Sequence, residues 1–165
     1  MGRLARQSSW PYRFRPFWIG WRISETLGGV LLQRLATAKT EKSLIEALRA
    51  VANSGFSPTF DKVKGYLNDK REQVRVDAVA ALALMPDAAV ETPLVERLTL
   101  DGAKKVRLAA LDVIGSRTPS DVLVSGLRQN VTADDPHVRY RALEIMIRWL
   151  PKRAELRDPV QQLEN

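Results

Sequence analysis

The sequence predicts an all-α fold, specifically an α-solenoid in which antiparallel helix pairs stack into a right-handed superhelix. The first observation is that the pair Val74-Arg75 recurs 32 residues later as Val106-Arg107 and again as Val138-Arg139. The second is that neighbouring columns recur in step: Ala78, Ala110 and Ala142; Val79, Leu111 and Leu143; Leu82, Ile114 and Met146. A period of roughly 20 to 50 residues with one helical stripe per period is typical of units that bury apolar faces only against neighbouring units.

Length and charge place a basic arm before a balanced domain. The 165 residues suffice for one domain whose core needs no disulfide or metal, and the chain has no cysteine. The formal charge is +7, but residues 1–23 hold five arginines and no acid, while the remaining 142 residues carry 21 basic and 19 acidic side chains. The basic balance therefore belongs to the arm rather than to the domain.

The sequence contains no membrane or secretion signal that we recognise. No apolar run approaches the roughly 18 residues that span a bilayer. Arg, Pro and Gly interrupt the first 24 residues throughout, so the uninterrupted apolar centre of a signal peptide is missing. The compartment stays open.

Residues 1–23 are predicted to form a basic aromatic arm, in which Pro11 and Pro16 prevent one continuous helix. One interpretation is a strap whose aromatic side chains cover the end of the helical stack. Another is contact with nucleic acid or an anionic membrane, with Arg supplying charge and aromatic rings supplying stacking or anchoring. A third is the remainder of a larger protein or a processed leader. The residues for the anionic contact are Arg13, Arg15, Trp18, Trp21 and Arg22.

Residues 24–165 are predicted to form about four helical pairs. The helical pattern starts near Ser24, and its predicted apolar stripe consists of Ile23, Leu27, Val30, Leu31 and Leu35. Gly28-Gly29 costs about 1 kcal/mol per glycine relative to alanine. Thr40 is the expected N-cap of the second helix, and Gly55 ends it. This pair is the first, degenerate repeat.

The next three pairs share a predicted start signal, a hydroxyl N-cap followed by proline at the first helical position. These dipeptides are Ser57-Pro58, Thr92-Pro93 and Thr118-Pro119. Pro151 closes the last helix, and residues 152–165 contain one short helix that either caps the stack or begins a partial repeat. A chain that ends within a repeat would imply a fragment.

Acidic residues in the turns between paired helices predict a ladder of ion pairs. Asp69 and Asp101 each stand six residues before an arginine of the repeated pair, Arg75 and Arg107, whereas the third copy has Ala133 there. An acid in such a turn caps the following helix, and a nearby arginine pairs with it. We expect this ladder to fix the register between repeats rather than to catalyse a reaction.

Three runs of the chain resemble the HEAT-like repeat, particularly the short bacterial type found in phycobilin lyases. They read ALRAVANSG (47–55), YLND (66–69) and VRVDAVAAL (74–82), and the same order of parts returns in 97–115 and 134–146. The resemblance covers residues 40–150 well, 24–39 weakly and 1–23 not at all. It implies an α-solenoid, and within the family it implies scaffolding of protein partners, DNA binding as in alkylpurine glycosylases, or bilin attachment.

A weaker similarity to the helical domain of vitellogenin-type lipid carriers implies a different origin. The chain would then be a helical segment of a larger lipid-transfer or multidomain protein. Such a carrier also needs large β-sheet domains, and no stretch of this sequence reads as a run of strands.

The sequence offers no constellation for catalysis, so we expect a non-enzyme without cofactor, metal or small-molecule substrate. His137 is the single histidine, and no cysteine exists to complete a ligand set or a nucleophile pair. Phosphate-binding glycine loops and the Gly-x-Ser-x-Gly element are absent from the sequence. Bilin attachment and glycosylase activity are disfavoured for the same reason.

A helical wheel identifies the surface most suited to binding a partner. With 100° per residue, positions 74, 78, 81, 82 and 85 face the core, and position 76 points almost opposite. The repeats place Val76, Leu108 and Tyr140 in this opposite column, with Lys105 and Arg141 as charged neighbours. We expect an apolar ridge on the concave face that holds a protein or peptide partner. The alternative for these side chains is packing between neighbouring helices.

Overall fold

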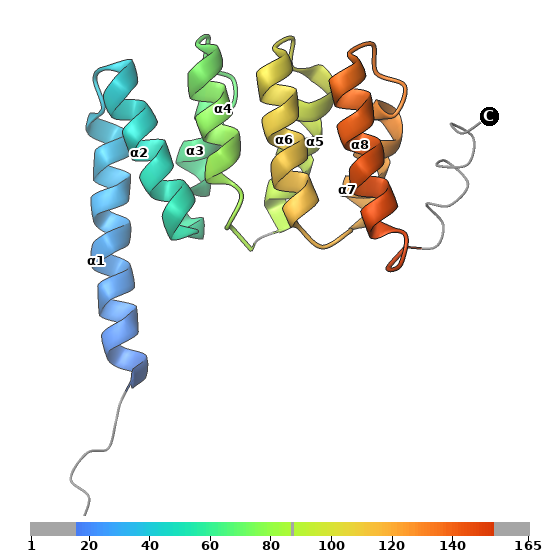
Figure 1. Ribbon diagram of the computed structural model, residues 1–165. Coiled ribbons are helices and arrows are strands. Elements are labelled where there is room, and N and C mark those ends of the chain that lie inside the picture. Colours follow the sequence, from blue (N-terminus) through green and yellow to red (C-terminus); the bar gives the residue numbers. More distant parts are fainter. Residues whose placement is uncertain (1–15, 87, 154–165) are drawn as a thin grey trace, which may run out of the picture.

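The computed structural model describes residues 16–86 and 88–153, with side chains from Thr26 onward, and this part of the chain is all-helical (Figure 1). It contains eight α-helices, two 3-10 helices and no strand, which confirms the predicted all-α class. The α-helices are α1 (Pro16–Thr37), α2 (Glu41–Ser54), α3 (Phe60–Tyr66), α4 (Glu72–Ala81), α5 (Glu91–Leu100), α6 (Lys104–Ser116), α7 (Asp121–Asn130) and α8 (Pro136–Trp149). The 3-10 helices are η1 (Ser57–Thr59) and η2 (Ala88–Val90).

The helices from α2 onward lie in two rows. In the even row, α2, α4, α6 and α8 stand side by side, and each contacts the next (Figure 1). In the odd row, α5 contacts α7, and α5 and α7 also contact the even-row helices that follow them. The even-row helices begin at the upper edge in Figure 1, which therefore carries the turns that precede α4, α6 and α8.

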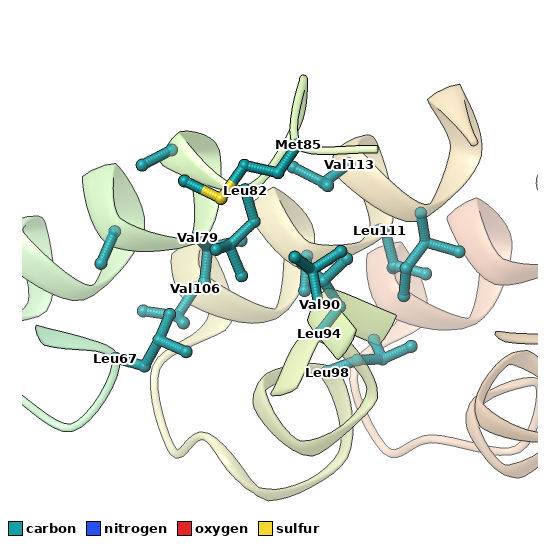
Figure 2. Close-up of a cluster of buried hydrophobic side chains, with 14 of the residues drawn as sticks. Leu67, Val79, Leu82, Met85, Val90, Leu94, Leu98, Val106, Leu111 and Val113 are labelled. Atoms are coloured by element: carbon teal, nitrogen blue, oxygen red, sulfur yellow. The ribbon is translucent and has the colours of Figure 1, made fainter. Parts of the chain in front are cut away.

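The core runs continuously between the two rows. Figure 2 shows side chains of α4, α5 and α6 meeting there, among them Val79, Leu94 and Val106. All three are completely buried. The predicted columns Val74/Val106/Val138, Ala78/Ala110/Ala142 and Leu82/Ile114/Met146 are also fully buried. The 32-residue period is thus the spacing at which equivalent side chains enter one core.

The first pair has the predicted start and stop of its second helix. The Thr40 side chain accepts a hydrogen bond from the Ser43 N–H at 3.1 Å, and the Ser43 side chain in turn accepts one from the Thr40 N–H at 3.1 Å, so the two residues form a capping box. Gly55 ends α2 with φ of 60°, a left-handed conformation in which a side chain is strained.

The predicted proline start signals are wrong in detail. Ser57-Pro58 lies inside η1, and Thr92-Pro93 lies inside α5. Helix α5 begins earlier than expected, at Glu91, because Val90 at the end of η2 already has a helical backbone conformation. Pro93 is the third helical residue, where its missing N–H still costs no intrahelical bond. Ser120, rather than Thr118, caps α7 by accepting from the Leu123 N–H at 3.3 Å.

The helical stripe of α1 also differs from the prediction. The helix begins at Pro16, eight residues before the expected start at Ser24, since proline is tolerated at the first helical position. The predicted boundary of the arm at residue 23 therefore falls within a helix. Leu31 and Leu35 are buried, whereas Leu27 and Val30 are exposed.

Candidate interaction surface

The exposed face of the even row carries the predicted apolar column. Val76 on α4 and Leu108 on α6 are half-buried and pack against the core, whereas Tyr140 on α8 is 71% exposed. The first two side chains therefore contribute to helix packing and present only part of their surface. Tyr140 is the member of this column that offers a large apolar contact to a partner.

Ion pairs between neighbouring even-row helices cross the same face. Arg49 of α2 donates from Nε to Asp77 of α4 at 2.8 Å. Lys105 of α6 lies 3.7 Å from Glu72 of α4, and both side chains are exposed. The sequence analysis did not find these pairs, although each joins opposite charges about one repeat period apart, which is the signal that would have revealed them.

Arg141 has a double role in this set. Its Nη2 lies 2.8 Å from Asp112 on α6, and its Nη1 lies 2.6 Å from Glu144 on α8. The hydrogen bonds to these two carboxylates raise the pKa of the Arg141 guanidinium. Arg141 therefore has two carboxylate partners within the chain, and Lys105 has one, Glu72.

A second set of charges occupies the turns at the upper edge. Arg75 donates to both carboxylate oxygens of Asp101, and its Nη1 donates to the backbone oxygen of Asp69 at 2.8 Å. Arg97 approaches the same Asp101 carboxylate at 3.6 Å. The expected Asp and Arg ladder therefore includes a buried junction between α4 and the turn before α6.

Hydrogen bonds lower the pKa values of two carboxyl groups in these turns, Asp101 and Asp69. Burial alone would raise the pKa of Asp101, but hydrogen bonds from Arg75 and from the Ala103 N–H outweigh it and lower the pKa below its ordinary value. At Asp69, the hydrogen bond from the Arg71 side chain is the largest effect and lowers the pKa to about 2. Both carboxylates are therefore ionised at neutral pH.

The ladder is interrupted at the next junction. Arg107 occupies the place of Arg75 one repeat later, but Ala133 stands where Asp101 would be. The Nε of Arg107 is buried and has no hydrogen-bond partner among the residues that the structure describes. Lys104 and Asp135, 3.3 Å apart, supply an ion pair nearby. A buried N–H without an acceptor reduces stability, so this junction is weaker than the one before it.

The described surface includes two open hollows outside the apolar column. One, of about 240 Å³, lies between α5 and α7 and is lined by Val95, Leu100 and Val122 among others. The other, of about 270 Å³, lies between α1 and α2 beside Arg34 and Glu46. Both are smaller than the roughly 300 to 1,000 Å³ of typical small-molecule pockets.

The described residues offer no constellation for metal binding, since no three His, Asp or Glu side chains are grouped to hold an ion. His137 is exposed, and its backbone N–H donates to the Asp135 cap at 2.9 Å. None of the described helices combines the length and apolarity needed to span a bilayer.

The arm residues lie largely beyond this description. Arg13 and Arg15 fall outside the described residues. Trp18, Trp21 and Arg22 belong to α1 by their backbone, but their side chains are outside the described part. The interpretation of the arm as an anionic contact therefore stays a prediction from sequence.

No model of a known protein family matches the chain. No curated protein matches it either. The HEAT-like resemblance accordingly rests on the repeated residues alone.

Proposed function

We propose that the protein is a non-catalytic interaction scaffold, an α-solenoid of the HEAT-like kind, that binds a protein or peptide on the exposed face of its even row. In this proposal the even row is the concave side of a right-handed superhelix, the side on which stacked helical repeats bind extended partners. Tyr140 is the principal apolar contact, and Val76 and Leu108 continue it across α6 to α4.

The observation that carries the proposal is the exposure of Tyr140. Tyr140 has 71% of its surface exposed, and it stands on a row of helices that pack on one continuous core, so it is an amphipathic side chain on a supported surface. Tyrosine is enriched at protein interfaces because its ring buries a large area and its hydroxyl forms a hydrogen bond. Arg141, which follows Tyr140 on α8, and Lys105 on α6 are the charged neighbours assigned to this contact, and both have acidic partners within the chain.

A site-specific photo-crosslinker tests the proposal. A photoreactive phenylalanine analogue at position 140 should yield one discrete adduct in cells of the source organism. The same analogue at Leu100, which is 72% exposed on the odd row, is the matched control and should yield none. Equal adduct patterns from both positions would contradict binding on the even row.

Substitution separates contact from packing. Tyr140→Ala should leave the thermal midpoint within about 1 °C of the unchanged protein, because substitutions of exposed residues alter stability little. It should also abolish the partner complex identified by cross-linking. Leu108→Ala should lower the midpoint by several degrees, since Leu108 packs against the core. A loss of several degrees with Tyr140→Ala would place Tyr140 in the packing instead.

The sequence of the arm favours a second candidate, binding to nucleic acid or an anionic membrane. Five arginines and three tryptophans without one acid in residues 1–23 are suited to polyanions. Binding to random duplex DNA or anionic vesicles should then weaken steeply between low and moderate salt, and should disappear when residues 1–23 are removed. An affinity that does not change with salt concentration would exclude this role for the arm.

A further inference from the structure

Along the even row, α2, α4 and α6 each have one edge that contacts the next helix of the row. On α4 this edge holds Val79, which is completely buried, and Arg75, which donates to Asp101 in the turn before α6. On α6 it holds Leu111, also completely buried. It also holds Gly115, where an added Cβ would lie 2.7 Å from Arg148 Nη2 and 3.1 Å from Ile145 Cγ1 of α8. We call this the receiving edge.

The receiving edge of α8 has the same kinds of residue but no helix of the described chain on it. Leu143, in the column of Val79 and Leu111, is only half-buried. Ile147, in the column of Gly115, is 52% exposed, and the exposed Tyr140 adjoins Leu143 one turn back. The end helix of a stack ordinarily presents polar side chains to water. This edge presents apolar ones.

Arg139 completes the correspondence with α4. Its Nη1 donates to the backbone oxygens of Ala133 at 2.7 Å and Asp134 at 2.9 Å, as the Nη1 of Arg75 donates to the backbone oxygen of Asp69. The Nε and Nη2 of Arg75 bind the Asp101 carboxylate. The same two atoms of Arg139 donate no hydrogen bond to the residues that the structure describes.

We propose that the receiving edge of α8, formed by Arg139, Leu143 and Ile147, binds an α-helix of a protein partner in the register in which α4 receives α6. The partner helix carries an acid three residues before its first helical residue, the place of Asp101 before Lys104, and that acid pairs with Arg139. The inference rests on the proposed function and specifies the kind of partner.

Charge and shape both favour this occupant. A carboxylate matches the two N–H donors on one side of a guanidinium and forms a bidentate pair. Leucine and isoleucine four residues apart on one helix form a stripe that an amphipathic helix covers. The guanidinium of Arg139 and the apolar stripe of Leu143 and Ile147 together favour a helix that has an acidic residue just before it.

The chain itself supplies a probe with this chemistry. A fluorescent peptide of residues 100–117 contains Asp101 and α6, and a covalent staple between positions 108 and 112 holds it helical, because short helices are marginal in water. We expect it to bind the full-length protein. Ile147→Asp should weaken binding at least tenfold, whereas Leu100→Asp, a change at an exposed leucine on the odd row, should alter it less than twofold.

A double-mutant cycle tests the acid. Arg139→Gln in the protein and Asp101→Asn in the peptide should each weaken binding about fivefold, and both together should weaken it no more than either alone. Absent binding, equal binding by the Ile147→Asp protein, or additive effects of the two changes would overturn the inference.

Two other occupants are outcomes of the same experiment. Self-association of the full-length protein that Ile147→Asp removes would assign the edge to a second copy and overturn a separate partner. If the peptide bound more than tenfold tighter to a chain ending at Arg153 than to the full-length protein, residues 154–165 would be the occupant of the edge. That outcome would also overturn a separate partner. Failure of the cross-link at position 140, with the peptide bound at the edge, would refute only the even-row face as the contact.

Discussion

The Arg75 guanidinium donates two hydrogen bonds to the Asp101 carboxylate, from Nε to Oδ2 at 2.8 Å and from Nη2 to Oδ1 at 3.0 Å. The Asp101 side chain is 2% exposed, and it also accepts the Ala103 N–H at 2.9 Å at the start of α6. One carboxylate therefore joins α4 to the turn before α6 and binds the backbone of Ala103, the residue before α6. The expectation that Asp101 caps α6 is wrong in detail, because no side chain accepts a hydrogen bond at the N-cap of this helix. A bidentate pair constrains angle as well as distance, so it fixes how neighbouring repeats align.

Asp101→Asn should lower the free energy of unfolding by about 3 kcal/mol, because removing one partner of a buried ion pair leaves the other charge uncompensated. Urea denaturation measures the change. The control is Lys105→Gln, which removes the exposed contact with Glu72 and should change stability by less than about 0.5 kcal/mol. Similar losses in both variants would show that burial does not distinguish the two pairs.

Asp69 makes the free energy of unfolding depend on pH. The Arg71 side chain lowers the pKa of Asp69 from an ordinary 3.8 to about 2, so the folded state binds its proton less readily than the unfolded state does. The contribution of Asp69 is complete above the unfolded pKa and is lost as the pH falls from about 4 to about 2.

The variant Asp69→Asn isolates this effect, because asparagine keeps the oxygen that accepts the Arg71 N–H at 2.9 Å. The stability difference between the unchanged protein and this variant should be largest at pH 5 to 7 and should close near pH 2, as measured by urea denaturation across that range. Arg71→Gln should remove the same pH-dependent difference. A difference that persists at pH 2 would assign the effect of Asp69 to something other than its charge.

The repeated columns predicted the all-α class because burial imposes an apolar residue at each of these positions. Val74, Val106 and Val138 had to be apolar at one spacing, and that spacing alone identifies the helices α4, α6 and α8 of the even row. The ion pairs were harder to predict from the sequence, because a charged side chain in a given turn has several opposite charges within reach. The sequence predicted Asp101 as a ladder residue, but it did not predict that Arg141 would pair with both Asp112 and Glu144. Exposure of Tyr140 follows from its place on α8, the last described helix of the row.

Ala133→Asp should stabilise the protein by about 1 kcal/mol, because it supplies an acceptor to the buried Arg107 Nε at the position equivalent to Asp101. Denaturant unfolding measures the gain. The control is the same substitution in an Arg107→Gln background, where the gain should vanish. A loss of stability in both backgrounds would mean that the turn before α8 cannot hold a carboxylate as the turn before α6 does.

Gly28 and Gly29 are adjacent in α1, yet their alanine variants should shift stability in opposite directions. An added Cβ at Gly28 would overlap the ring of Phe56, whereas one at Gly29 would meet no atom within 4 Å. Gly29→Ala should therefore stabilise by about 1 kcal/mol through helix propensity alone. Gly28→Ala should destabilise by about 1 kcal/mol, since the cost of overpacking exceeds the same gain.

Thermal or urea unfolding of the two variants compares them directly, and Phe56→Leu provides the decisive background. Leucine lacks the outer part of the ring that an alanine at position 28 would overlap, so Gly28→Ala should become neutral or stabilising there, while the effect of Gly29→Ala should stay the same. If Gly28→Ala remained equally destabilising in the Phe56→Leu background, the close approach of Phe56 to α1 would not be the reason for a glycine at this position.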